Sequence, residues 1–397
     1  MASTRLGYLA LKKETTKATT VKPTNFIRYK EGDIGFNQEV IEANPITSNR
    51  WNALTPVKGK ITTDSDFKMD VDAKEIWYLF LMALWGYTKT TLSWVAIKHL
   101  FSVANDLPGF TIEQLKGNPS STDYEVIRAY GALLDSFDIT WSDGICEIDV
   151  KLKAYGVFTK WSLTADGAIW SPATLTMTDT RGLVATDLIK VSDISPATEN
   201  TTVTAVSSQT AITATTTAAH TVANKAKVEL RPQTPSYSQV ALPFSFVHAD
   251  FQFGADLTAA ASAAFTNIEN WTFSFQNGLE ERYWSNSASP SVIAPKWAMA
   301  SFKFTKYFTD STDRDKYLDI EQQAVIMTLD LGKKIGATSY NYKLIVRIAD
   351  MRFKTYDMPT GSDELYAVDL EGTCYYDPTA AKAIEIELNN DITDYAV

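Results

Sequence analysis

The sequence contains few of the residues on which most active sites depend. Two cysteines and three histidines occur among 397 residues. Cys146 and Cys374 lie far apart, with no CxxC pattern and no nearby histidine, which argues against a disulfide framework or a thiolate metal site and favours reduced thiols in a cytosolic product. His99, His220 and His248 are scattered, and none has a second ligand at metal spacing. We therefore expect structural histidines, no metal and no cofactor.

A surplus of basic residues is also missing. The chain has 37 Lys and Arg against 47 Asp and Glu, a net charge of −10 at neutral pH. Proteins that coat nucleic acids usually cluster Lys and Arg, because these residues displace the counterions of the phosphates. The composition therefore argues against a general nucleic-acid coating protein. It leaves open an acidic surface that repels DNA.

Long hydrophobic segments are absent. The longest apolar run, Ile76–Trp85, has ten residues, whereas a membrane-spanning helix needs about 20. This run predicts a buried helix, with Asp72 placed to cap its start. No signal peptide is expected, because Met1–Arg5 leads into a mixed polar stretch.

Catalytic motifs are missing as well. No GxSxG, HExxH or GxGxxG occurs, and Gly86–Thr90 lacks the upstream glycine of a phosphate-binding loop. The densest carboxylate cluster, Asp310, Asp313, Asp315 and Asp319, lacks the glycine that an EF-hand turn requires. We interpret these residues as acids near a helix N-terminus, where the helix dipole favours negative charge. Nothing here specifies an enzyme.

The sequence is rich in strands that alternate apolar and polar residues. Such alternation on both sides of Ser142-Asp143-Gly144 predicts a hairpin over residues 136–155, because the glycine accepts the positive φ of a tight turn. Further strands are predicted at Phe67–Val71, Trp271–Phe275, Phe302–Phe304, Leu344–Phe353 and Tyr366–Leu370.

Helices are expected to be few and short. Besides the apolar helix after Asp72, a second helix is predicted to begin at Thr122, because Thr122 and Glu125 have the spacing of a capping box. A third is predicted over Asp313–Gln323.

The composition changes sharply in the middle of the chain. Of the 25 residues 201–225, 17 are Thr, Ser or Ala, which predicts a small β-module with a thin core. We place this inserted module at 161–235, between residues 1–160 and 236–397. The two flanking halves share the order of their predicted elements, which supports a diverged duplication.

Acidic residues lie on the polar sides of the predicted strands. They are Asp138, Glu147, Asp149, Asp369 and Glu371. Two interpretations remain open: a solvated sheet face, or strands that line a wide pore.

Three stretches of the chain resemble the tail tube, or major tail, proteins of long-tailed bacteriophages. Leu6–Pro23, followed by Phe26–Tyr29, is similar to the opening segment and first strand of that family. Thr180–Ser192, continuing to Val203–Val206, resembles its small β insertion, and Asn270–Glu281 resembles its second-half strand and corner.

The resemblance implies a mainly β fold with a few short helices, made of two tandem tail-tube-like β-sandwich or barrel domains and an inserted β-module on the outside. It implies a non-enzymatic virion protein, assembled in the host cytoplasm into rings that stack into a tube for DNA. Its partners would be copies of itself, the tape measure protein, and the tail terminator and tip proteins, with no specific DNA binding and no membrane. Two tube-like halves per chain would favour rings of three chains with pseudo-sixfold symmetry over hexamers. The five acidic residues above would then face the lumen.

Two other classes remain as alternatives. A capsid or decoration β-protein would share the strand content and the acidity. A carbohydrate-binding virion protein is suggested by Trp271, Trp284 and Trp297, although aromatic residues at alternating strand positions more often belong to a core.

Overall fold

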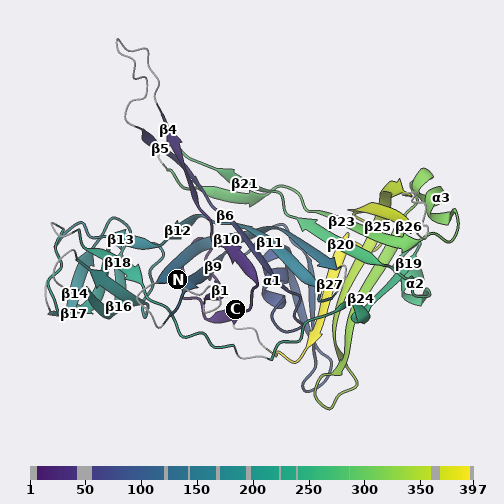
Figure 1. Cartoon of the computed structure of the whole chain (residues 1–397), viewed down its shortest axis with the longest axis horizontal. Helices are drawn as coiled ribbons and strands as arrows, with labels where there is room; N and C mark the ends of the chain where they lie inside the picture. The colour runs from purple at the N-terminus through teal and green to yellow at the C-terminus, as the bar shows by residue number, and fades with distance from the viewer. Residues whose placement is uncertain are drawn as a thin grey trace, which may run out of the picture.

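The computed structural model describes residues 7–42, 56–119, 124–141, 144–166, 170–193, 198–222, 225–237, 240–285, 287–358 and 367–393. The protein is mainly β, with short helices. A six-stranded sheet lies at one end of the molecule, and the second half of the chain lies at the other (Figure 1). Among the described residues, no helix has the length and apolar character that crossing a membrane requires.

Most strands belong to one large, curved sheet with the shape of a half-barrel (Figure 1). Both halves of the chain contribute to it. Its strands are β1 (Tyr8–Lys13), β2 (Asn25–Ile27), β3 (Glu31–Asp33), β6 (Asp64–Asp70), β7 (Trp85–Thr91), β8 (Ile97–Val103), β9 (Phe110–Gly117), β10 (Tyr124–Trp141), β11 (Glu147–Lys153), β12 (Gly156–Phe158), β19 (Ala249–Gly254), β20 (Asn270–Gln276), β23 (Met299–Tyr307), β24 (Gln323–Lys334), β25 (Asn341–Asp357), β26 (Ala367–Tyr375) and β27 (Ile384–Asn390).

Strand β10 bends and changes partners along its length. Its first part pairs with β9 and β12, and its second part pairs with β11 and β20. Gly131 lies at the change with a φ of 61°, and a Cβ there would come within 2.7 Å of the Tyr155 ring. A glycine therefore allows the bend. The predicted hairpin is confirmed by the pairing of Thr140 with Glu147 and of Leu134 with Leu152; its turn residues 142–143 lie outside the described residues.

The two halves of the chain meet in the same sheet. Strand β10 of the first half pairs with β20 of the second, and β27 pairs back onto β8. One part of the sheet therefore runs without interruption through β3, β6, β11, β10, β20, β23, β26 and β25.

Helix α1 (Trp77–Leu84) confirms the predicted apolar helix. Each of its side chains is buried, which explains why its sequence is apolar on all sides. Asp72 accepts hydrogen bonds from the backbone N–H groups of Lys74 and Glu75, in the turn that leads into the helix. Trp85, with a φ of 57°, ends it.

The helix predicted from Thr122 is wrong. Thr122 lies outside the described residues, and the segment from Tyr124 onward is strand β10. Residues 126–134 are all buried, because Val126 packs into one hydrophobic core and Ile127 into another on the opposite face. A strand buried on both faces loses its alternation, so its apolar residues also match a helical pattern.

The predicted helix at Asp313–Gln323 is shorter in the structure. Helix α3 spans Thr312–Leu318. Ile320 has a φ of 53°, which ends the helical path, and Gln323 already begins β24. The other helical segments are α2 (Leu257–Ser262) and the short 3-10 helix η2 (Phe246–His248).

The middle of the chain forms the six-stranded sheet, in the order β13, β18, β15, β16, β17, β14. A hydrophobic core of mostly small and branched residues lies within it and extends to Tyr8, Leu115 and Val126 of the large sheet. The strands are β13 (Lys160–Ser162), β14 (Trp170–Thr176), β15 (Leu188–Ser192), β16 (Thr198–Ser208), β17 (Ala211–Thr216) and β18 (Lys227–Leu230).

Two further hairpins extend the large sheet. They are β4 (Asn37–Ile41) with β5 (Val57–Thr62), and β21 (Leu279–Arg282) with β22 (Val292–Pro295). They lie side by side (Figure 1), joined by a hydrogen bond from the Ile61 N–H to the Ala288 carbonyl.

Candidate functional site

The candidate site is the polar face of the uninterrupted part of the large sheet. The register places Glu147, Thr140, Thr272, Lys303 and Glu371 opposite one another in a single row across five strands. A second row holds Asp149, Asp138, Ser274 and Ser301. Asp369 lies two residues from Glu371 on β26, and so on the same face. The structure thus brings the five acidic residues singled out from the sequence onto one face of one sheet.

The opposite face of these strands is apolar and covered by helices. Phe137 is fully buried between Phe275 and Phe80 of α1, with ring centroids 5.4 and 5.9 Å away. In the second half, Tyr317 of α3 stacks on Tyr356 of β25 at 6.2 Å. Both helices therefore pack on the apolar face, on the other side of the sheet from the acidic residues.

Lysines partly neutralise one end of the polar face. Lys30 forms ion pairs with Asp70 and Glu147, each at 2.6 Å, and Lys68 reaches Glu147 at 2.8 Å. The hydrogen bonds from both lysines lower the pKa of Glu147. Bonds to Glu147 raise the pKa of Lys68. This carboxylate is held ionised at neutral pH.

Elsewhere on this face carboxylates repel each other. Asp138 and Asp149 lie directly opposite on β10 and β11. Burial raises the pKa of Asp149, and the nearby charges of Glu147, Asp138 and Glu31 raise it further, against an opposing effect of Lys68. Like charges placed opposite across strands are destabilising. The two facing carboxylates therefore carry a local electrostatic cost.

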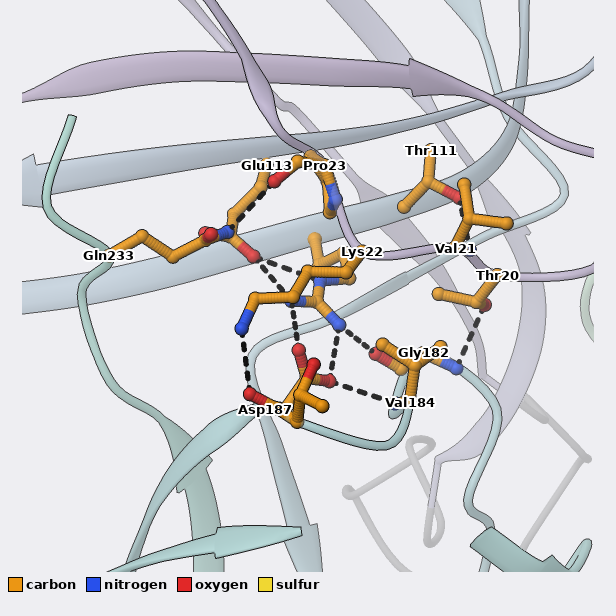
Figure 2. A network of polar contacts seen from close by, with 12 residues as sticks. Thr20, Val21, Lys22, Pro23, Thr111, Glu113, Gly182, Val184, Asp187 and Gln233 are labelled. Atoms are coloured by element: carbon orange, nitrogen blue, oxygen red, sulfur yellow. Dashed lines mark hydrogen bonds and ion pairs between the residues drawn. The ribbon is translucent and has the colours of Figure 1, made fainter. Parts of the chain in front are cut away.

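A buried ionic network joins the six-stranded sheet to the first half of the chain (Figure 2). Arg128 donates to Glu113 of β9 at 2.6 and 2.9 Å and to Asp187 at 2.7 and 2.9 Å. All three side chains are 1% exposed. Glu113 also accepts from Tyr8 at 2.6 Å and from Gln233 at 2.8 Å.

The charges in this network are balanced by their partners. Burial would lower the pKa of Arg128, but the carboxylates of Glu113 and Asp187 raise it well above its ordinary value. Burial, together with the Glu113 charge, raises the pKa of Tyr8, which remains a donor. Two further hydrogen bonds lie at the edge of the network (Figure 2). Lys22 donates to the Thr186 carbonyl at 2.6 Å, and Thr20 accepts from the Gly182 N–H at 3.1 Å.

Sequence reasoning missed this network. The available signal was a single arginine inside the apolar stretch at 126–134, since a charge in such a stretch needs a buried partner. Its partners lie 15 and 59 residues away. No short motif connects them, so only the tertiary fold identifies the set.

The three histidines form hydrogen bonds or ion pairs with neighbouring side chains. His99 bonds to Tyr87 and Asn390, and burial lowers its pKa to about 4. His220 contacts Asp193 and Glu199, and His248 contacts Ser245.

The structure also places the cysteines, the carboxylate cluster and the tryptophans that were considered from the sequence. Cys146 is buried and Cys374 partly buried, both as free thiols. Asp313 forms an ion pair with Lys306. Trp271 is a core residue at 2% exposed, whereas Trp284 and Trp297 are exposed.

A broad, charged sheet face backed by an aromatic core defines a mainly β protein with one extended polar surface. In the described part of the chain, no group of His, Cys, Asp and Glu residues could hold a metal ion. A family model described as phage tail tube protein matches residues 4–374, and the chain belongs to this family. It is a non-enzymatic structural protein of the virion tail. The comparison with curated proteins gave no match.

Proposed function

We propose that copies of this chain form rings that stack into a hollow tail tube, and that the polar sheet face lines its lumen as a conduit for DNA. The observation that carries this proposal is the continuity of one acidic face across both halves of the chain, with the helices α1 and α3 on the other side. DNA carries one charge per about 1.7 Å of its axis and would adhere to a basic wall. A wall with Asp138, Asp149, Asp369 and Glu371 repels the duplex and lets it slide.

The pairing of the strands supports a duplicated chain. In the first half β6 pairs with β3 and β11, and β10 pairs with β9, β11 and β12. In the second half β23 pairs with β20 and β26, and β25 pairs with β24, β26 and β27. The element after β6 is α1 and the element after β23 is α3. Both halves thus follow one plan.

Irregularities in the ladders recur at matching places. A register shift between Ala129 and Ala132 of β10 has its counterpart between Ile348 and Met351 of β25. A second shift follows at Leu134 in β10 and at Phe353 in β25. The first and second shifts are the same number of residues apart in β10 as in β25. Each β10 residue therefore corresponds to the β25 residue 219 positions later. Bulges at corresponding positions are hard to explain by convergence.

The matched registers refine the correspondence between the halves. They align Asp149 with Asp369. They align Phe67 with Phe304. With two equivalent units per chain, three chains suffice for a ring with pseudo-sixfold symmetry.

Stacking of the rings is supported by the β4–β5 hairpin, which projects from the body of the molecule (Figure 1). Val40, Ile41 and Val57 of this hairpin are 62%, 47% and 58% exposed. Exposed apolar side chains on a projecting element suit a contact with a neighbouring ring. The six-stranded sheet lies at the far end of the first half, which fits the proposed decoration of the outer surface.

Electron microscopy of the purified protein tests the proposal. We expect hollow filaments built from stacked rings. Closed shells would indicate a capsid protein instead, and particles that attach singly to preformed capsids would indicate a decoration protein. Either result would overturn the proposed tube.

A further inference from the structure

We propose that neighbouring copies in a ring are joined by strand pairing between the end of β25 in one copy and the β3–β4 segment of the next, with Tyr356 opposite Phe36. This inference rests on the proposed ring. It goes further by naming the two edges and the register between them.

Two strand edges of the polar sheet remain unpaired among the described residues. The end of β25, from Arg352 to Asp357, pairs with β26 on one side only. At the other end of the sheet, β3 pairs with β6 and the following β4 pairs with β5, again on one side only. Next to β3, the Gly32 carbonyl and the Ile34 N–H bond to the Gln114 side chain, so the edge that is open to another strand begins after Ile34. Another strand can add at such an edge, because its N–H and C=O groups are not used in a ladder.

The junction between the two halves shows what such a contact looks like. Strand β10 pairs antiparallel with β20, with Ser136 opposite Gln276 and Phe137 opposite Phe275. The two phenylalanine rings are 5.4 Å apart, and both side chains are buried at 0% and 1% exposed.

The matched registers show which residues at the two free edges correspond to the paired residues of β10 and β20. The end of β10 corresponds to the end of β25, so Phe137 corresponds to Tyr356. On the other strand, Gly32 lies opposite Phe67 as Trp271 lies opposite Phe304. Phe36 is four residues after Gly32, and Phe275 is four residues after Trp271.

The β4–β5 hairpin confirms this second alignment independently. Asn37 pairs with Thr62 as Gln276 pairs with Met299, and Thr62 and Met299 each precede the aligned phenylalanine by five residues. The predicted contact is therefore Thr355 opposite Asn37, Tyr356 opposite Phe36, and Asp357 opposite Gly35.

The exposure of Phe36 indicates that its partner lies outside the chain. Phe36 is 54% exposed, whereas its counterpart Phe275 is covered by β10. Tyr356 already stacks on Tyr317 of α3, as Phe137 packs on Phe80 of α1. In a second copy of this chain, β25 supplies the missing strand, with Tyr356 in the place of Phe137 and α3 in the place of α1. We therefore assign a second copy as the partner of this surface.

Cross-linking tests the register. A double variant, Phe36→Cys with Tyr356→Cys, should form a disulfide between copies on mild oxidation, because directly opposite residues bring their Cβ atoms close to disulfide distance. The native thiols should not compete, because burial raises the pKa of Cys146 and of Cys374 to about 12, with Asp350 adding to the effect at Cys374. The control variant, Phe36→Cys with Thr355→Cys, places the second thiol on the other face.

We expect filaments of the double variant under reducing conditions, and after oxidation a denaturing gel in which covalent products end at three linked chains. Filaments without the cross-link, or equal cross-linking of the control, would overturn the register while leaving the tube intact. Failure of the unmodified protein to form filaments would instead count against the tube itself.

A second variant keeps the test decisive if the cysteine pair disturbs assembly. Phe36→Asp should abolish ring formation without lowering the melting temperature of the monomer, because Phe36 is exposed. Phe265→Asp alters a residue that is 64% exposed elsewhere and should assemble normally. Normal assembly of Phe36→Asp would overturn the inference.

Discussion

At the scale of single residues, the polar face combines attraction with repulsion. Glu147 is stabilised by two lysines, whereas Asp149 faces Asp138 across the ladder. Period-two alternation was enough to predict that these side chains share a face with their neighbours on the same strand. It could not predict Lys30 as a partner, because the contact spans 117 residues.

The substitution Asp149→Asn should stabilise the protein at pH 7 by about 0.2–1 kcal/mol, the range of cross-strand pair energies. The folded pKa of Asp149 is raised above the ordinary value of 3.8, so its ionisation opposes folding and stability is lost as the pH rises through the folded pKa. The gain should shrink as the pH falls toward 3.8. Urea denaturation at several pH values measures it.

Glu147→Gln provides the matched control with the opposite sign. The pKa of Glu147 is lowered in the folded state, so its charge favours folding above its ordinary pKa, and the glutamine variant should be less stable at pH 7. Equal effects of the two substitutions would contradict the assigned electrostatics.

Arg128→Met should lower the free energy of unfolding by about 3–5 kcal/mol, because it leaves the buried carboxylates of Glu113 and Asp187 without their cation. Arg181→Met is the control. Arg181 pairs with Asp179 but is 56% exposed, and such pairs contribute about 0–1 kcal/mol. Similar losses for both variants in urea denaturation would refute a structural role for the buried network.

At the scale of elements, the sequence predicts strands that alternate apolar and polar residues, but it does not predict a strand that is buried on both faces. The alternating strands at Phe67, Trp271 and Phe302 and the apolar helix after Asp72 were found, because each has one dominant periodicity. The start of β10 matches a helical pattern, because the six-stranded sheet covers a face of this strand that would otherwise be solvated and polar. That covering depends on the Arg128 network and the shared core, which no local pattern reveals.

The six-stranded sheet should be removable if its contact surface is repaired. Its first and last strands pair with each other through Lys160 and Glu229, so its ends lie close together and a short linker can replace residues 161–235. Leu115 and Val126 belong to its core, so they should be changed to Thr in the same variant. We expect this variant to assemble into filaments that lack the six-stranded sheet.

Deletion without the two Thr substitutions serves as the comparison. It exposes an apolar patch, so we expect aggregation and reduced recovery of soluble protein. Loss of filaments in the repaired variant would contradict the proposed role of the module as a decoration.

At the scale of the whole molecule, the proposed role of the polar face depends on assembly. Among the described residues, a single chain presents a charged sheet with two edges that no other strand covers. Three chains joined as β10 joins β20 would close the sheet around an acidic lumen. The family was recognisable from the sequence, whereas the edge register was not, because it depends on bulges in β10 and β25 that only the pairing reveals.

Reversing charges on the polar face should make the tube bind DNA. In Asp149→Lys with Glu371→Lys, the proposed lumen acquires cations that release phosphate counterions, so DNA retention by filaments should appear at low salt and fall as salt rises. Asp106→Lys with Glu321→Lys makes the same change in net charge at exposed positions off this face. DNA retention by the control alone would contradict a lumen formed by the polar face.

The most direct test is a cryo-electron microscopy map of the assembled filament. The predicted result is a ring of three chains with six similar sheet units, with Glu147, Asp149 and Glu371 facing the lumen and α1 and α3 behind the sheet. A map with this acidic face turned outward or buried between rings would contradict the proposed conduit, and a ring of six chains would contradict the proposed three-chain ring.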